Sequence, residues 1–153
     1  MTEADVLAVA ELKEQWAAPA DAAAPDQRRR FAETLAKWIE REGASLIARV
    51  ADHQGELVGM AWLVAFARVP NIDQPVRLTG DIQSVYVAPA FRGAGVGRAL
   101  VASLLDAADT RGIDRVTVSA NRAAASLYAQ LGFRSDEFLL ERRRPASTDV
   151  SSP

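Results

Sequence analysis

The sequence contains no cysteine and only one histidine, His53, among its 153 residues. Without cysteine the chain cannot form disulfides, attack a substrate with a thiolate or bind zinc through sulfur. A Ser-His-Asp hydrolase would have to use His53, which lies in a predicted hairpin turn and is expected to face solvent. A metal site would rest almost entirely on carboxylates, and we expect no metal in this protein.

Long apolar runs and a strong charge bias are also missing. The longest apolar stretch, LVGMAWLVAF at residues 57–66, is about half the ~20 residues that a membrane-spanning helix needs. The first residues, MTEADVLAVAELKEQWA, carry acids where a signal peptide carries basic residues. The formal net charge of -2 argues against a general nucleic-acid binder. We therefore expect a cytoplasmic protein without membrane or nucleic-acid partners.

The remaining composition is that of a soluble globular protein. Hydrophobic residues make up 49% of the chain and charged residues 25%. The length fits one domain, which we expect at residues 1–144. The last stretch, PASTDVSSP at residues 145–153, is polar and has nothing to bury, so we expect a disordered tail.

Apolar periodicity predicts an α/β domain. Two amphipathic helices come first, one around residues 6–16 and one from about residue 31 to Gly43. Strands are expected at residues 45–52, 57–66, 81–88, 114–120 and 133–144. A polar loop at residues 68–80 precedes the third strand, and helices follow the third and fourth strands. Because helical crossovers join parallel neighbours, the sheet should be mixed.

The stretch FRGAGVGRALV at residues 91–101 opens the third helix with three glycines between two arginines. No Ser, Thr, Asp or Asn occurs from residue 89 to 102, so no side chain is available to cap the first N–H groups of this helix. Glycines let a ligand approach the backbone, and the helix dipole and the arginines attract negative charge. A bound anion, most simply a phosphate or pyrophosphate, would supply the missing acceptor.

The distribution of charge favours the same interpretation. No Asp or Glu occurs at residues 82–105 or 115–135, whereas five arginines do. Taken alone, the glycine turn leaves phosphate binding and a plain solvated turn about equally open. It is not a Walker loop, because no Lys-Ser or Lys-Thr follows, and Leu100 stands where a dinucleotide fingerprint needs its third glycine.

Two segments resemble the GCN5-related N-acetyltransferases (GNAT). VYVAPAFRGAGVGRALV at residues 85–101 resembles their acetyl-CoA-binding segment, with the signature [RQ]-x-x-G-x-[GA]. ANRAAASLYAQLGF at residues 120–133 resembles their strand end with an Asn, followed by a helix with Leu-Tyr. The similarity covers about residues 44–141. It implies a mixed, mostly antiparallel sheet with parallel, splayed middle strands and helices on both faces. The family's first strand is expected to be missing or very short here.

The resemblance also implies a reaction, in which an amine attacks acetyl-CoA directly in a ternary complex. Tyr128 would protonate the departing CoA thiolate. Asp81, where related enzymes often carry a Glu, would act as the base. From the residues alone, Tyr128 also fits a core aromatic, and Asp81 a hydrogen bond at the end of a strand. The residues expected to bind acetyl-CoA are Val85, Val87, Arg92, Gly93, Ala94, Gly95, Val96, Gly97, Arg98 and Asn121.

Alternatives to this function stay open, as does the acceptor. The chain could be a CoA-binding module without catalysis, or it could use another acyl-CoA. In the family, the acceptor site is shaped by the first helices and by a loop that corresponds here to residues 68–80. Those segments contain no motif that separates peptide N-termini, lysines, polyamines, aminoglycosides and small metabolites. A homodimer is also left open.

Overall fold

The computed structural model describes residues 3–17, 24–135 and 139–142. The elements in chain order are α1 (Glu3–Ala17), α2 (Pro25–Glu42), the 3-10 turn η1 (Gly43–Ser45), β1 (Leu46–His53), β2 (Glu56–Ala67), β3 (Leu78–Val87), the 3-10 turn η2 (Pro89–Phe91), α3 (Val96–Thr110), β4 (Arg115–Val118) and α4 (Ala125–Gln130). No strand precedes α1 within these residues. None of the described helices is long and apolar enough to cross a membrane.

The four strands form one mixed sheet in the order β1-β2-β3-β4. The pairs β1/β2 and β2/β3 are antiparallel, and β3/β4 is parallel because α3 crosses over between those two strands. The predicted mixed α/β fold is confirmed. The parallel pair, however, lies at the edge of the sheet rather than in its middle, because no described residue forms a strand on the far side of β4.

The last predicted strand is the main correction to the expected elements. Residues 133–135 and 139–142 have no strand structure, although apolar residues in this segment suggested one. A strand needs a paired neighbour as well as a favourable composition, and these residues do not pair with β4. Residues 136–138 and 143–144 of that prediction lie outside the described residues, as does the predicted tail at 145–153.

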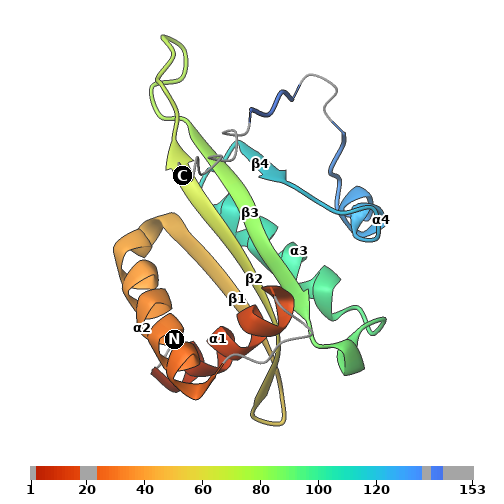
Figure 1. Cartoon of the computed structure of the whole chain (residues 1–153). Helices are drawn as coiled ribbons and strands as arrows, with labels where there is room; N and C mark the ends of the chain where they lie inside the picture. Colours follow the sequence, from red (N-terminus) through yellow and green to blue (C-terminus); the bar gives the residue numbers. More distant parts are fainter. Residues whose placement is uncertain (1–2, 18–23, 136–138, 143–153) are drawn as a thin grey trace, which may run out of the picture.

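Helices cover both faces of the sheet, which gives three layers (Figure 1). On one face, α3 packs its buried side chains, Leu104 among them, against the sheet. On the other face, α1 and α2 pack against a second apolar cluster that includes Met60 and Trp62. Strand β2 is buried on both faces, as its almost continuous apolar run predicted.

Strand β3 begins at Leu78, earlier than predicted, so Asp81 is an interior residue of the strand rather than its first. Residues 78–80 fall in the predicted loop at residues 68–80, which is polar and contains two prolines. A Cβ at Gly80 would lie only 2.9 Å from Leu63 Cδ2 of β2, so the glycine leaves room for the Leu63 side chain to pack over it. The ladder with β2 therefore extends to the pair Ala67 and Leu78.

Candidate functional site

The start of α3 has the open geometry that an anion site requires. Gly95 is the N-cap residue with φ 83°, a left-handed conformation that favours glycine, and no side chain caps the helix. Gly93 has φ 79°, and a Cβ added to either glycine would meet nothing within 4 Å. The first turn contains no acidic residue. The predicted uncapped helix start is confirmed, and its N–H groups are accessible to a ligand.

Three elements meet at this helix start. A Cβ at Gly97, in the first turn of α3, would lie 3.5 Å from Leu127 Cδ1 of α4 and 3.6 Å from Val87 Cγ2 at the end of β3. The two segments on which the family resemblance rests, far apart in sequence, are therefore neighbours in space.

Strand β3 carries a bulge where it parts from β4. Opposite β2, Trp62 pairs with Ser84 and the next residue, Leu63, pairs with Ile82, so Gln83 is the extra residue. The β3/β4 pairing ends at the pair Ile82 and Val118. From there the two strands diverge (Figure 1). Residues 83–87 of β3, including Val85, thus have an edge without a strand partner, along which an extended ligand could pair.

The two arginines that flank the glycines have different surroundings. Arg92 Nε donates a hydrogen bond to the carbonyl oxygen of Val87 at 2.9 Å, and its guanidinium carbon lies 5.6 Å from the centre of the Tyr86 ring. These contacts anchor Arg92 at the end of β3. Arg98 is exposed in the first turn of α3. Both therefore add positive charge near the helix start.

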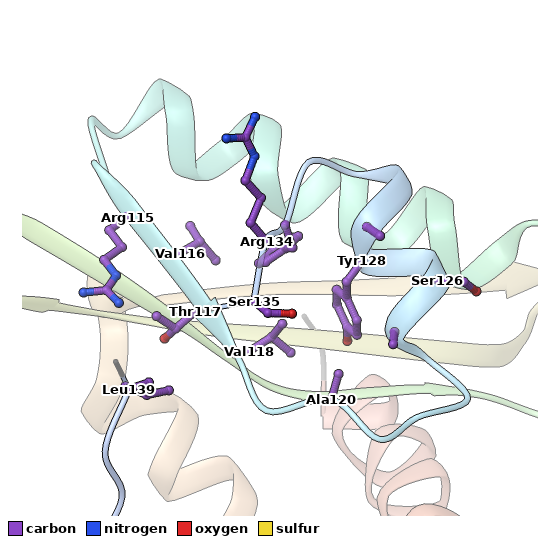
Figure 2. Close-up of a pocket in the computed structure, with 13 residues that line it drawn as sticks. Arg115, Val116, Thr117, Val118, Ala120, Ser126, Tyr128, Arg134, Ser135 and Leu139 are labelled. Atoms are coloured by element: carbon purple, nitrogen blue, oxygen red, sulfur yellow. The ribbon is translucent and has the colours of Figure 1, made fainter. Parts of the chain in front are cut away.

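Tyr128 of α4 lines a cavity of about 1030 Å³ that lies along β4 (Figure 2). Its side chain is only 7% exposed, and its ring packs edge-on against Phe133 with 5.3 Å between the ring centres. Burial raises the pKa of Tyr128, which keeps the phenol protonated at neutral pH. Tyr128 is therefore a core residue and also reaches a cavity, so the two interpretations of this tyrosine do not exclude one another.

Asn121 lies in the turn between β4 and α4. Its Oδ1 accepts a hydrogen bond from the backbone N–H of Ala124 at 2.9 Å. The regular helix α4 begins at Ala125, with Ala124 as its N-cap and no side-chain cap, so Asn121 closes the turn that precedes the helix rather than capping the helix itself.

Asp81 faces the side of the sheet opposite α3. Its neighbours Gly80 and Ile82 point toward the α3 side, and side chains alternate along a strand. Asp81 Oδ1 accepts a hydrogen bond from Thr117 Oγ1 of β4 at 3.2 Å. Tyr128 packs on the α3 side. The predicted acid and base therefore come from opposite faces of the sheet, on either side of the place where β3 and β4 part.

Sequence reasoning missed Lys13 of α1, which donates a hydrogen bond to Ser84 Oγ just beyond the bulge. A lysine in an amphipathic helix usually looks like surface. Its spacing contained a signal, because Lys13 stands four residues after Val9 and three before Trp16, on the apolar side of the helix. His53, by contrast, is exposed as predicted.

Comparison with known proteins places the chain among acetyltransferases. The model of a family described as "Acetyltransferase (GNAT) family" matches residues 9–133. A glucosamine 6-phosphate N-acetyltransferase of Trypanosoma brucei brucei is 33% identical over 99 residues, which are 63% of this chain and 65% of that protein. A mycothiol acetyltransferase of Thermobispora bispora is 37% identical over 99 residues, or 31% of its own length. The chain thus spans less than two thirds of either relative.

Solved structures show the same fold. A Trypanosoma brucei acetyltransferase aligns with a TM-score of 0.73 and 27% identity, over 94% of this chain and 96% of its own. An acetyltransferase from Clostridium acetobutylicum, solved with acetyl-CoA, aligns with a TM-score of 0.71 at 18% identity, over 94% of this chain and 92% of its own. At the lower identity the likeness concerns the fold alone.

Proposed function

This chain belongs to the acetyltransferase (GNAT) family, and on that premise we propose that it transfers the acetyl group of acetyl-CoA to a primary amine. The observation that carries the proposal is the meeting of three elements: the uncapped start of α3 lies against the end of β3, whose edge is free beyond its bulge, and against α4, which carries Tyr128. Together they offer a place for a diphosphate, an extended arm and a leaving group.

The backbone of residues 93–98 binds the CoA diphosphate in this proposal. Its N–H groups have no side-chain acceptor, and the helix dipole favours negative charge at this end. The pantetheine arm lies along β3, where Val85 and Val87 pair with it through their backbone. Asn121, at the turn after β4, closes the other side of the site.

The chemistry is one acyl transfer. The amine nitrogen attacks the thioester carbon, a backbone N–H near Val87 polarises the carbonyl oxygen, and the carbon–sulfur bond breaks. Tyr128 gives its phenolic proton to the leaving thiolate. Asp81 takes the proton that the amine loses, directly or through a water. Burial raises the pKa of Tyr128, so the phenol carries its proton at neutral pH and is a weaker acid than an exposed phenol.

Two experiments test this function. Isothermal titration should show that the protein binds acetyl-CoA. Absence of a heat of binding at hundreds of micromolar acetyl-CoA would contradict the proposal. A thiol-release assay over a panel of primary amines should show turnover. Binding of acetyl-CoA without turnover would favour the alternative of a CoA-binding module without catalysis. Faster release of CoA thiol from a longer acyl-CoA than from acetyl-CoA would show that the longer acyl-CoA is the preferred donor.

A further inference from the structure

Side chains of α1 reach β3 on the sheet face that also carries Asp81. Lys13 Nζ donates a hydrogen bond to Ser84 Oγ, and the Tyr86 hydroxyl donates to Gln15 Oε1 at 3.1 Å. Ser84 is buried and directly follows the bulge. The ammonium group of Lys13 therefore lies at the point where β3 parts from β4, close to where the proposed transfer occurs.

Lys13 is a half-buried cation that forms no ion pair with any residue in the described part of the chain. Its ammonium lies 4.1 Å from the centre of the Trp16 ring, and its hydrogen-bond partner is a neutral hydroxyl. Burial lowers the pKa of Lys13 because it removes water from the charged form. A ligand anion would restore the stabilisation that this ammonium has lost.

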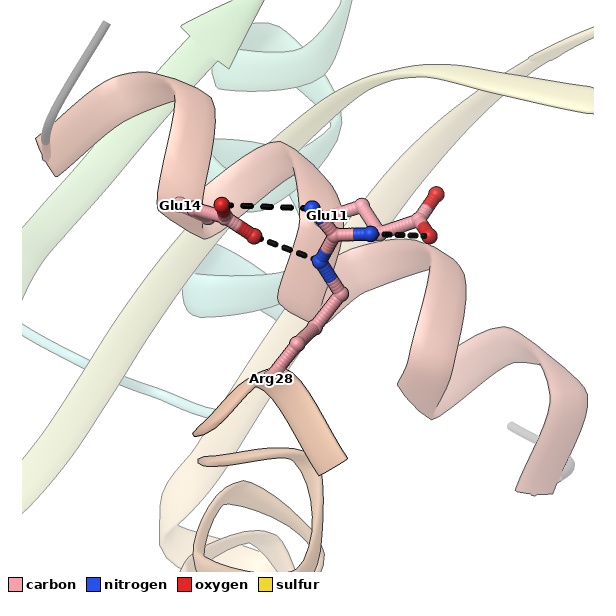
Figure 3. Close-up of polar contacts among 3 residues, drawn as sticks. All are labelled: Glu11, Glu14 and Arg28. Atoms are coloured by element: carbon pink, nitrogen blue, oxygen red, sulfur yellow. Dashed lines mark hydrogen bonds and ion pairs between the residues drawn. The ribbon is translucent and has the colours of Figure 1, made fainter. Parts of the chain in front are cut away.

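The carboxylates nearest to Lys13 in sequence are engaged elsewhere. Glu14 and Glu11 hold Arg28 of α2, at 2.6 Å and 3.4 Å (Figure 3). A second cation, Arg92, lies over the ring of Tyr86. Two cations, Lys13 and Arg92, thus lie beside this face of β3, which also carries the carboxylate of Asp81. The nearby acids of α1, Glu11 and Glu14, pair with a different arginine.

We propose that Lys13, in the positive field of Arg92, binds an anionic group of the acceptor, a phosphate or a carboxylate. The substrate is then a small amine that also carries a negative charge. This inference rests on the proposed acetyltransferase function. It agrees with the name of one relative, which is a glucosamine 6-phosphate N-acetyltransferase.

The experiment compares amines that differ in one anionic group. The thiol-release assay is run with glucosamine and glucosamine 6-phosphate, and with propylamine and β-alanine, so that the two pairs separate phosphate from carboxylate. The variants are Lys13→Met, Lys13→Arg and Lys37→Met. Lys37 is the only other lysine of the chain and is exposed on α2, so its variant is the matched loss of one positive charge.

We expect at least a tenfold higher kcat/KM for the anionic member of one pair. Lys13→Met should lose this preference through KM, Lys13→Arg should keep most of it, and Lys37→Met should keep all of it. Equal kcat/KM within both pairs, or a preference that survives in Lys13→Met, would overturn the inference while leaving the acetyltransferase function intact.

If no amine of the panel is acetylated, a binding measurement tests the inference instead. Glucosamine 6-phosphate and β-alanine are each titrated into the CoA-loaded protein, with Lys13→Met as the comparison and thermal unfolding as the check that the variant is folded. Binding that Lys13→Met abolishes supports the inference without turnover, and binding of neither compound sinks it. Failure to bind CoA itself counts against the proposed function instead.

Discussion

Among single residues, Tyr128 is the one whose proposed role as proton donor can be tested most selectively. Tyr128→Phe keeps the ring that packs against Phe133 and removes only the hydroxyl. General-acid catalysis contributes about 10²–10⁴-fold, so we expect kcat to fall by about two orders of magnitude with unchanged affinity for acetyl-CoA. Steady-state kinetics and isothermal titration on the same preparation check this. Full turnover in Tyr128→Phe would assign the proton to another donor.

The pH dependence of kcat gives a second test of Tyr128. Burial raises the pKa of its phenol above the usual value of about 10, so the proton donor persists up to that pH and is lost only above it. The alkaline decline of kcat should therefore begin above about pH 10 and be missing from Tyr128→Phe. A decline in the wild type between about pH 8 and 9, equally present in the variant, would show that a different group controls the step.

The proposed role of Asp81 as the base is tested by raising the pH until the amine substrate is deprotonated in solution and no longer needs a base. Asp81→Asn retains an oxygen for the hydrogen bond from Thr117 but cannot take a proton. We expect turnover at pH 7 to fall at least tenfold, and the deficit to shrink as the pH approaches about 10, where an alkyl amine loses its own proton. A deficit that stays constant over the pH range would assign Asp81 a structural role.

At the scale of elements, the glycines at the two ends of α3 offer a matched comparison. Gly95 and Gly112 have φ 83° and 67°, and a Cβ at either would meet no atom within 4 Å. Alanine in that left-handed conformation costs roughly 1–2 kcal/mol, so both variants should lose similar stability. Only Gly95→Ala should also lose at least tenfold in CoA affinity by isothermal titration. Equal CoA affinities in the two variants would show that the start of α3 does not bind CoA.

Most elements could be predicted from the sequence because their signals are local. The uncapped start of α3 followed from the absence of Ser, Thr, Asp and Asn, and burial of β2 on both faces followed from its apolar run. The start of β3 at Leu78 could not be predicted, because residues 78–80 are in the strand through their pairing with Ala65–Ala67 of β2, which is not a local signal. The strand expected at residues 133–144 failed in its described parts for a similar reason, since pairing is not local.

In the candidate site, too, the features encoded in short motifs were predicted and the contacts between distant segments were not. The glycines and Tyr128 belong to two short motifs, and the structure brings these segments together as the family resemblance implied. The contact between Lys13 and Ser84 joins residues 71 positions apart, and no local pattern encodes which partner a helical lysine meets. Features that depend on packing between distant segments are therefore the ones that sequence reasoning missed.

For the molecule as a whole, the α3 layer should carry much of the stability. Leu104 is fully buried between α3 and the sheet. Leu104→Ala should lower the free energy of unfolding by about 2–5 kcal/mol, as measured by urea denaturation. Leu7→Ala, at an α1 position that is 47% exposed, should cost much less. Equal losses would show that the core does not lie where the structure places it.

The central claim is that the start of α3 binds the diphosphate of CoA, and an NMR titration of the ¹⁵N-labelled protein tests it most directly. CoA should shift the backbone amides of residues 93–98 more than any other group of amides, whereas pantetheine, which lacks the diphosphate, should leave them in place and shift amides of β3. If CoA binds without moving the amides of Gly93, Gly95 and Gly97, or if pantetheine moves them equally, the claim is contradicted.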